Sequence, residues 1–247
     1  MNKNIEAVMT DTKHLFRSIP PVILTLFTVS VIVMNILANK TVFQNDWIAV
    51  DGGFLVSWLS FLCMDVITRA FGPKAATKIS VFALLINLFV CVLFFITAKI
   101  PTETDFSAFN MVIGGTWFIL LSSSIAFISS AVINNFLNWN IGKLFSKNPD
   151  GKLAYATSCY VSTFIGQFCD NMIFASLTFM LFAPIFWNGF HWTPIQCINS
   201  SILGALLELF MEVIFSPIGY IILKEWRKDG IGQEYVKEYV NENNSYR

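Results

Sequence analysis

The stretch Leu153–Phe182, LAYATSCYVSTFIGQFCDNMIFASLTFMLF, decides the fold class of this chain. Its 30 residues are mostly apolar, and at about 1.5 Å of rise per residue such a helix is long enough to cross a bilayer core. The middle of the stretch nevertheless holds Gln167, Asp170 and Asn171. Polar groups at that depth are tolerated only where they face other helices, water or a ligand. The stretch is therefore predicted to be a membrane helix that forms one wall of a site.

The composition of the whole chain indicates the same class. Hydrophobic residues make up 55% of the 247 residues and charged residues only 13%, whereas soluble domains carry about 25% charged residues. The five cysteines form no C-x-x-C pair, so they are read as small buried apolar residues, and no metal site is expected. No nucleotide-binding loop and no catalytic motif occurs, so we expect no cofactor, no enzymatic activity and no nucleic-acid partner.

Six segments are apolar and long enough to span a membrane, which predicts an all-α polytopic membrane protein. The predicted spans are Pro20–Ala38, Ile48–Ala70, Ile79–Ala98, Met111–Ile141, Leu153–Phe182 and Ile195–Leu223. The second span has Asp51, Gly52 and Gly53 in its first turns. A re-entrant or unwound start is expected there, which is allowed at membrane depth only beside protein or water.

Positive charges are distributed unevenly along the chain. If the amino terminus is cytoplasmic, all but two of the 16 lysines and arginines fall on the cytoplasmic side, and only Lys40 and Lys99 lie outside. This asymmetry predicts an even number of spans in the cytoplasmic membrane with both termini inside. Residues 1–18 are then an amphipathic interfacial helix or a solvated tail, residues 19–223 form the membrane domain, and residues 224–247 are a charged, solvated or partly disordered tail.

Few ionisable side chains lie inside the predicted spans. Asp65 and Arg69 are four residues apart, so they share a helix face and are predicted to pair, either as a structural contact or as part of a gate. Glu208 and Glu212 are also four apart, and no basic residue lies in the same span. Two ionised carboxylates on one face repel, so this pair requires a proton, a cationic partner or water.

The polar residues of the fifth and sixth spans are predicted to meet. Thr163, Gln167, Asp170 and Asn171 cluster on one helix face. Helical rise places Asp170 about 18 Å and Glu208 about 14 Å from the outer ends of their spans. The two carboxylates are therefore expected to face one cavity near the bilayer midplane, where carriers usually bind substrate.

The residue types of this predicted cavity suggest a cationic or guanine-like ligand. Apart from Asp51 at the start of the second span, four acids and one base lie within the spans, a balance that favours cations and rejects phosphates. Carboxylates and carboxamides also suit adjacent N–H donors, which can bond bidentately to one carboxylate. Asn134 is either an interhelical hydrogen-bonding residue or a further substrate contact. His191 and Trp192 are read as an interfacial anchor.

Four motifs carry a family resemblance: DVITRAFGPKAATK at residues 65–78, AVINNFLNWNIGKLF at 131–145, STFIGQFCDNMIF at 162–174 and MEVIFSPIGYII at 211–222. Together they resemble the bacterial and archaeal queuosine precursor transporters, a six-helix membrane family. The resemblance implies import of a 7-deazaguanine, namely 7-aminomethyl-7-deazaguanine, 7-cyano-7-deazaguanine or queuine, for tRNA modification.

The resemblance also implies roles for particular residues. The family's fifth-span aspartate and amide match Asp170 and Gln167, and its second-span aspartate matches Asp65. Many members have a glutamate where this chain has Arg69, and many have a glutamate that matches Glu212. The predicted substrate site therefore comprises Asp170, Gln167, Asn171, Thr163, Glu208, Glu212 and Asn134, with Asp65 and Arg69 as the gate or structural pair.

Two other classes of function stay open at this point. A substrate-binding subunit of a vitamin-type uptake system also has about six helices but depends on a separate ATPase. A membrane scaffold would use the same polar groups only to bond its helices together. Apart from the bilayer and the small-molecule substrate, the expected partner is a second copy of the chain in a homodimer.

Overall fold

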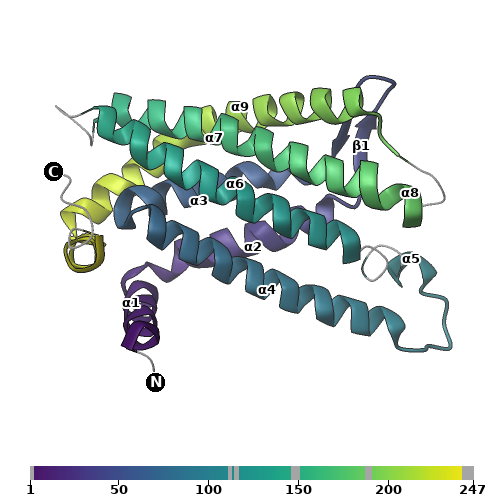
Figure 1. Ribbon diagram of the computed structural model, residues 1–247, viewed down its shortest axis with the longest axis horizontal. Helices are drawn as coiled ribbons and strands as arrows, with labels where there is room; N and C mark the ends of the chain where they lie inside the picture. Colours follow the sequence, from purple (N-terminus) through teal and green to yellow (C-terminus); the bar gives the residue numbers. More distant parts are fainter. Residues whose placement is uncertain (1–2, 111–112, 114–116, 146–150, 187–190, 241–247) are drawn as a thin grey trace.

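The computed structural model describes residues 3–110, 113, 117–145, 151–186 and 191–240. Within these residues, long helices pack side by side into one bundle (Figure 1), which confirms the prediction of an all-α polytopic membrane protein. The long helices are α2 (Pro21–Leu37), α3 (Phe54–Phe71), α4 (Pro73–Lys99), α6 (Trp117–Leu144), α7 (Lys152–Ala175) and α9 (Pro194–Lys228). Five of them are long and apolar enough to span a membrane on their own, and α2 completes a sixth candidate span together with the helical residues before it.

The amino-terminal segment forms the helix α1 (Lys3–Ser18), which turns away from the bundle at 103° to α2. The two prolines Pro20 and Pro21 explain the bend, because a residue before proline is driven out of the helical conformation. Pro20 has φ −58° and ψ 130°, and the helix resumes at Pro21. Figure 1 shows α1 standing across the end of the bundle.

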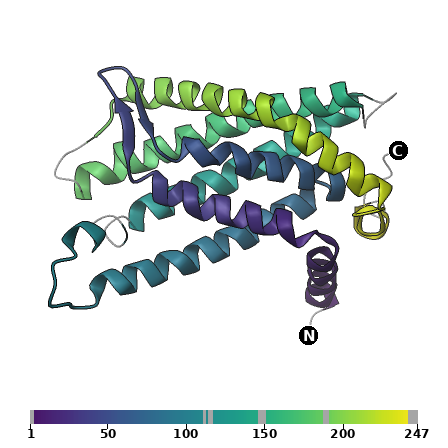
Figure 2. The same ribbon diagram turned by 180° about the vertical axis from the view of Figure 1, so that it is seen from behind.

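A short β-hairpin replaces the predicted start of the second span. Strands β1 (Thr41–Gln44) and β2 (Ala49–Asp51) pair antiparallel at the end of the bundle opposite α1 (Figure 2). A Cβ atom on Gly52 would lie 2.8 Å from the carbonyl oxygen of Leu37, so glycine allows the hairpin to return against the end of α2. The second span therefore begins at Phe54 and not at Ile48.

One further predicted boundary shifts for an identifiable reason. Gly72 ends α3 with a φ of 88°, and Pro73 starts α4 at once, six residues before the predicted Ile79. The predicted start of the fourth span, Met111, lies outside the described residues.

The last two spans are longer and less regular than predicted. After Ala175, α7 continues as a π-helix, η2 (Ser176–Phe182), and then as α8 (Ala183–Phe186). Helix α9 runs through Pro217, which removes one backbone hydrogen bond, and its second half turns away from the first (Figure 2).

Helix α7 lies at the centre of the arrangement, packed against both α6 and α9, and α3 closes the bundle against α9 and α2. Helix α4 is at the edge, where it leans away from the other helices toward the short helix α5 (Ser107–Phe109) (Figure 1). The buried residues of α4 run from Ala75 to Asn87, and none lies in the last 12 of its 27 residues.

The carboxyl-terminal segment folds back onto the bundle instead of staying fully solvated. After α9 the chain turns at Gly230 and Gly232, both with positive φ, and continues as α10 (Gln233–Tyr235) and η3 (Val236–Val240). Tyr235 is 2% exposed, and its hydroxyl donates a 2.6 Å hydrogen bond to Asp11 on α1. Helices α1 and α10 therefore lie together at one end of the bundle.

Candidate functional site

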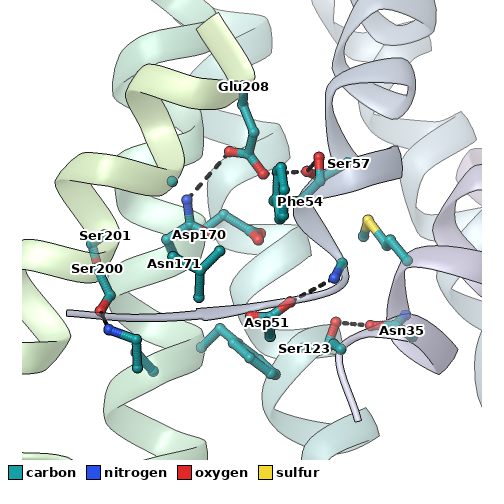
Figure 3. A pocket seen from close by; sticks show the side chains of 18 of the residues that line it. Asn35, Asp51, Phe54, Ser57, Ser123, Asp170, Asn171, Ser200, Ser201 and Glu208 are labelled. Atoms are coloured by element: carbon teal, nitrogen blue, oxygen red, sulfur yellow. Dashed lines mark hydrogen bonds between the residues drawn. The ribbon is translucent and has the colours of Figure 1, made fainter. Parts of the chain in front are cut away.

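A pocket opens in the half of the bundle nearer the hairpin (Figure 3). The cavity measures about 60 Å³ and is partly open to solvent. It is smaller than the roughly 300–1,000 Å³ of typical small-molecule sites, so its walls must move apart before it can hold a small molecule. The wall comes from α2, β2, α3, α6, α7 and α9, so distant parts of the sequence converge on it. Its polar side chains include Asn35, Asp51, Ser57, Ser123, Asp170, Asn171 and Glu208.

Glu208 ties α9 to two neighbouring helices. It accepts a hydrogen bond from the hydroxyl of Ser57 on α3 and a 3.2 Å bond from Nδ2 of Asn171 on α7. The side chain is only 1% exposed, so these two donors stabilise a carboxylate that would otherwise be costly to bury. Glu208 is therefore held in a fixed position at the wall of the pocket.

Asp170 lies beside Asn171 on α7 and points into the same pocket (Figure 3). Its Oδ1 accepts a 2.8 Å hydrogen bond from the hydroxyl of Ser130 on α6. The close approach of α7 and α9 depends on Gly204, since a Cβ atom there would lie 2.7 Å from Nδ2 of Asn171. Asp170 and Glu208 thus face one cavity, as helical rise predicted.

The hairpin supplies a third carboxylate, Asp51, which sequence reasoning did not place in the site. Its Oδ1 accepts a 2.7 Å hydrogen bond from the backbone N–H of Gly53. Burial raises the pKa of Asp51 from 3.8 to about 6, although the Gly53 N–H acts in the opposite direction. The backbone N–H of Ala49 donates to Ser200 Oγ on α9 at 2.8 Å and so anchors the hairpin over the pocket.

Three aromatic side chains, Phe54, Phe174 and Trp192, line the pocket. Phe174 lies one turn beyond Asp170 and Asn171 on α7, whereas Phe54 and Trp192 come from other parts of the chain. Trp192 is 3% exposed and stacks on Phe179 with ring centroids 3.8 Å apart. The interpretation of Trp192 as an interfacial anchor is therefore wrong, because its ring is buried against η2.

A second group of polar residues lies deeper in the bundle, farther from the hairpin. We call it the deep cluster: Asp65, Asn134, Asn138, Cys159, Thr163 and Glu212. Asp65 is fully buried and accepts three hydrogen bonds, from Asn134 Nδ2 at 3.1 Å, Asn138 Nδ2 at 2.7 Å and Thr163 Oγ1 at 3.3 Å. Its donors come from α6 and α7, so this one carboxylate joins three helices.

Glu212 has the opposite environment. It is also fully buried, yet neither of its carboxylate oxygens has a hydrogen-bond partner in the described part of the chain. One oxygen of Glu212, one of Asp65 and the sulfur of Cys159 all lie within 4.8 Å of one another, a spacing at which three ligands can hold an ion. No metal-ligand spacing along the sequence predicts this group, because its members come from three different helices.

Arg69 does not form the predicted ion pair. Its guanidinium donates a 2.7 Å hydrogen bond to the carbonyl oxygen of Ala154 and another to Ser158 Oγ, both on α7. It also lies 5.9 Å from the ring centroid of Tyr155. Among the described residues no ion pair joins Arg69 to Asp65, because the first turns of α7 engage the guanidinium instead.

The predicted site residues therefore divide between two places. Asp170, Asn171 and Glu208 line the pocket. Thr163 and Asn134 contact Asp65 in the deep cluster, where Glu212 also lies. Gln167 comes between the two groups on α7, fully buried and with neither amide atom partnered among the described residues.

A bundle of spanning helices around a pocket of carboxylates and amides defines a multi-pass membrane protein with a polar binding site. Comparison with known proteins narrows this class. Residues 51–222 match the model of a family described as "Putative vitamin uptake transporter", and the chain belongs to this family of membrane transporters. No curated protein and no solved structure matched the chain. The family match begins at the pocket residue Asp51 and includes every acid of both polar groups.

Proposed function

We propose that this transporter imports a queuosine precursor across the cytoplasmic membrane and binds it in the pocket between α7, α9 and the hairpin. The observation that carries the proposal is the meeting of Asp51, Asp170 and Glu208 with the carboxamide of Asn171 in one pocket. Carboxylates and a carboxamide are the groups that recognise a guanine-like edge. The resemblance of the four sequence motifs to queuosine precursor transporters supports the same substrate class.

The pocket suggests a distinct task for each carboxylate. Both oxygens of Glu208 are engaged by Ser57 and Asn171, so Glu208 positions the amide. Asp170 is partly exposed to the pocket, and we assign it to the adjacent N–H donors of the 7-deazaguanine ring. Asp51, on the hairpin, is then the partner of the cationic amine that the aminomethyl precursor and queuine carry.

Aromatic and deeper residues complete the proposed path. Phe54 and Phe174 provide flat apolar surfaces for the heterocycle. Thr163, Gln167 and Asn134 lie beyond the pocket, and we propose that they line the way inward when the site changes its exposure from one side of the membrane to the other.

The test measures queuosine in the tRNA of cells that cannot make the precursor and receive it from the medium. The native chain should restore queuosine, and Asp170→Asn should lower uptake at least about tenfold, which corresponds to about 1.4 kcal/mol of lost binding or more. Asp105→Asn is the matched control, because Asp105 is an exposed aspartate that does not line the pocket. Full uptake by Asp170→Asn would remove Asp170 from the site, and no uptake by the native chain would refute the substrate.

A second candidate is the substrate-binding subunit of a vitamin-type uptake system, which the family description favours. Such a subunit needs a separate ATPase to move its ligand. Purified chain in liposomes distinguishes the two functions: accumulation of labelled queuine by the chain alone supports an independent carrier. Accumulation that requires an added ATPase pair and ATP supports the subunit.

A further inference from the structure

The deep cluster contains two carboxylates with unequal hydrogen bonding. Asp65 accepts three bonds from neutral donors, which stabilise its ionised form. Glu212 accepts none in the described part of the chain, although it is fully buried. An ionised carboxylate without donors is very costly in such a place, so Glu212 requires a positive charge from outside the protein's own side chains.

The ionisable groups around Glu212 do not supply that charge. Asp65 and Cys63 on α3 and Tyr155 and Cys159 on α7 lie near it, and all four are neutral or acidic. Helix α6 contributes only uncharged amides to the cluster, and Glu208 is a further acid one turn away on α9.

The nearest base is Arg69, one turn beyond Asp65 on α3. Its guanidinium is engaged by Ala154 and Ser158 at the start of α7. It also faces the ring of Tyr155 and acts through space on Asp65, and it makes no hydrogen bond to Glu212. One negative charge of the two carboxylates therefore stays uncompensated.

We propose that Asp65 and Glu212 bind one proton between them and that this proton is the coupling ion of import. The proton-binding site is distinct from the substrate pocket, and its role in coupling rests on the proposed transport function. In the proposed step a proton from water adds to Glu212 to form the neutral acid, and Glu212 later returns it to water on the other side. No bond other than O–H forms or breaks.

A proton fits the donor set better than a metal ion. The amide nitrogens of Asn134 and Asn138 point to Asp65, which turns their oxygens away from it. A cation between the carboxylates would then have ligands only from Asp65, Cys159 and Glu212, whereas hard cations take six or more oxygen ligands. The Cys159 sulfur is also engaged, as it accepts a 3.6 Å bond from Asn138 Nδ2.

The position of Glu212 also provides a route for the proton. Glu208 and Glu212 are four residues apart on α9, so about 6 Å of helical rise separates them. Glu208 lies at the wall of the pocket, which is open to solvent. Glu212 is therefore one helical turn from a group that contacts the water-accessible cavity.

The first experiment needs no substrate. Infrared difference spectra of the purified full chain are recorded against pH, and the C=O band of a protonated carboxylic acid is measured. The native protein should show a titrating band that Glu212→Gln removes and Glu208→Gln retains. Asp65→Asn should shift the pH midpoint at which the band titrates, because Asp65 is the residue that shares the proton with Glu212.

Three results would overturn the proposal. The first is an unchanged band in Glu212→Gln. The second is loss of the native band when Na⁺ replaces K⁺ at constant pH, which would make the site a sodium site. The third is loss of the band on addition of Zn²⁺ with recovery by a chelator. If Glu212→Gln does not fold, Asp65→Asn alone decides, and an unshifted midpoint in that variant counts against the shared proton.

The second experiment tests coupling in liposomes with labelled queuine. An inward proton gradient should drive accumulation by the native chain at least about tenfold above equilibrium. Glu212→Gln should still exchange queuine across the membrane but lose the accumulation. Accumulation by Glu212→Gln equal to that of the native chain would overturn the coupling role. Absence of exchange in both proteins would refute the proposed substrate, and the infrared result would still decide the proton site.

Discussion

The two polar regions of this bundle use the same residue types in opposite ways. In the pocket, Glu208 and Asp170 accept hydrogen bonds from neighbouring helices and lie beside solvent-accessible space. In the deep cluster, Asp65 takes all the available donors and Glu212 is left with none. The difference teaches that a carboxylate with hydrogen-bond donors beside a water-accessible cavity can bind a solute. A buried carboxylate without hydrogen-bond donors is suited to a small cation. Asp65 against Asp170, and Glu212 against Glu208, compare the two regions directly.

The largest difference is expected for loss of the two aspartates. Asp65→Ala leaves Asn134 and Thr163 without an acceptor, at about 1–3 kcal/mol each, and Asn138 with only its bond to Cys159. Asp170→Ala leaves no donor unpaired, because Ser130 still donates to the carbonyl oxygen of Phe127. Thermal unfolding of the purified variants should therefore show a much larger loss of stability for Asp65→Ala. Equal losses would mean that the hydrogen bonds of the deep cluster add little to the fold.

The second comparison uses the two glutamates of α9. Glu208→Gln should weaken equilibrium binding of queuine about tenfold, or by about 1.4 kcal/mol, because it loosens Asn171 and removes a charge from the pocket. Glu212→Gln should leave the affinity within about twofold. Calorimetric titration of both variants measures the difference, and a larger effect at Glu212 would place the substrate in the deep cluster.

The third comparison concerns two glycines of α9. A Cβ atom at Gly204 would press on Asn171, so Gly204→Ala should weaken queuine binding a few-fold. At Gly219 the added atom would meet the hydroxyl of Tyr155, so Gly219→Ala should lower stability by about 1 kcal/mol without a change in affinity. Gly204→Ala should thus have the larger effect in the binding assay, and Gly219→Ala the larger effect on thermal unfolding.

The smallest effect is expected for Asp51. Because burial raises the pKa of Asp51 from 3.8 to about 6, the folded protein holds its proton more tightly than the unfolded chain does. The stability from this group is complete below pH 3.8 and is lost as the pH rises through about 6. Asp51→Asn should therefore flatten the pH dependence of unfolding across that range. Asp105→Asn should leave the profile between pH 3.8 and about 6 nearly unchanged, because the hydrogen bond from the Ser107 backbone lowers the pKa of Asp105 instead of raising it.

Much of the architecture follows from local features of the sequence. Apolar length predicts the spans, Gly72 and Pro73 predict the break between α3 and α4, and helical rise predicts that Asp170 and Glu208 face one cavity. These features depend on residues close together in the chain or on simple depth along a helix.

The rest depends on packing between helices that no single segment encodes. Asn138 and Cys159 join Asp65 only because α6 and α7 turn those faces toward α3. The hairpin was missed because its strands are short, and β1 has exposed side chains without a clear alternation. The one local signal for it was the Asp51-Gly52-Gly53 sequence, which predicted an irregular start but not a carboxylate in the pocket.

The lean of α4 has a consequence for the membrane around the protein. Its 27 residues measure about 40 Å along the axis, whereas a bilayer core is about 30 Å thick. A helix of that length fits only when tilted, by about 40° if all of it is submerged. Because the buried residues of α4 end at Asn87, its last 12 residues can change tilt as lipid thickness changes. The acyl-chain length of the lipids should therefore change the tilt of α4 before it affects any other helix.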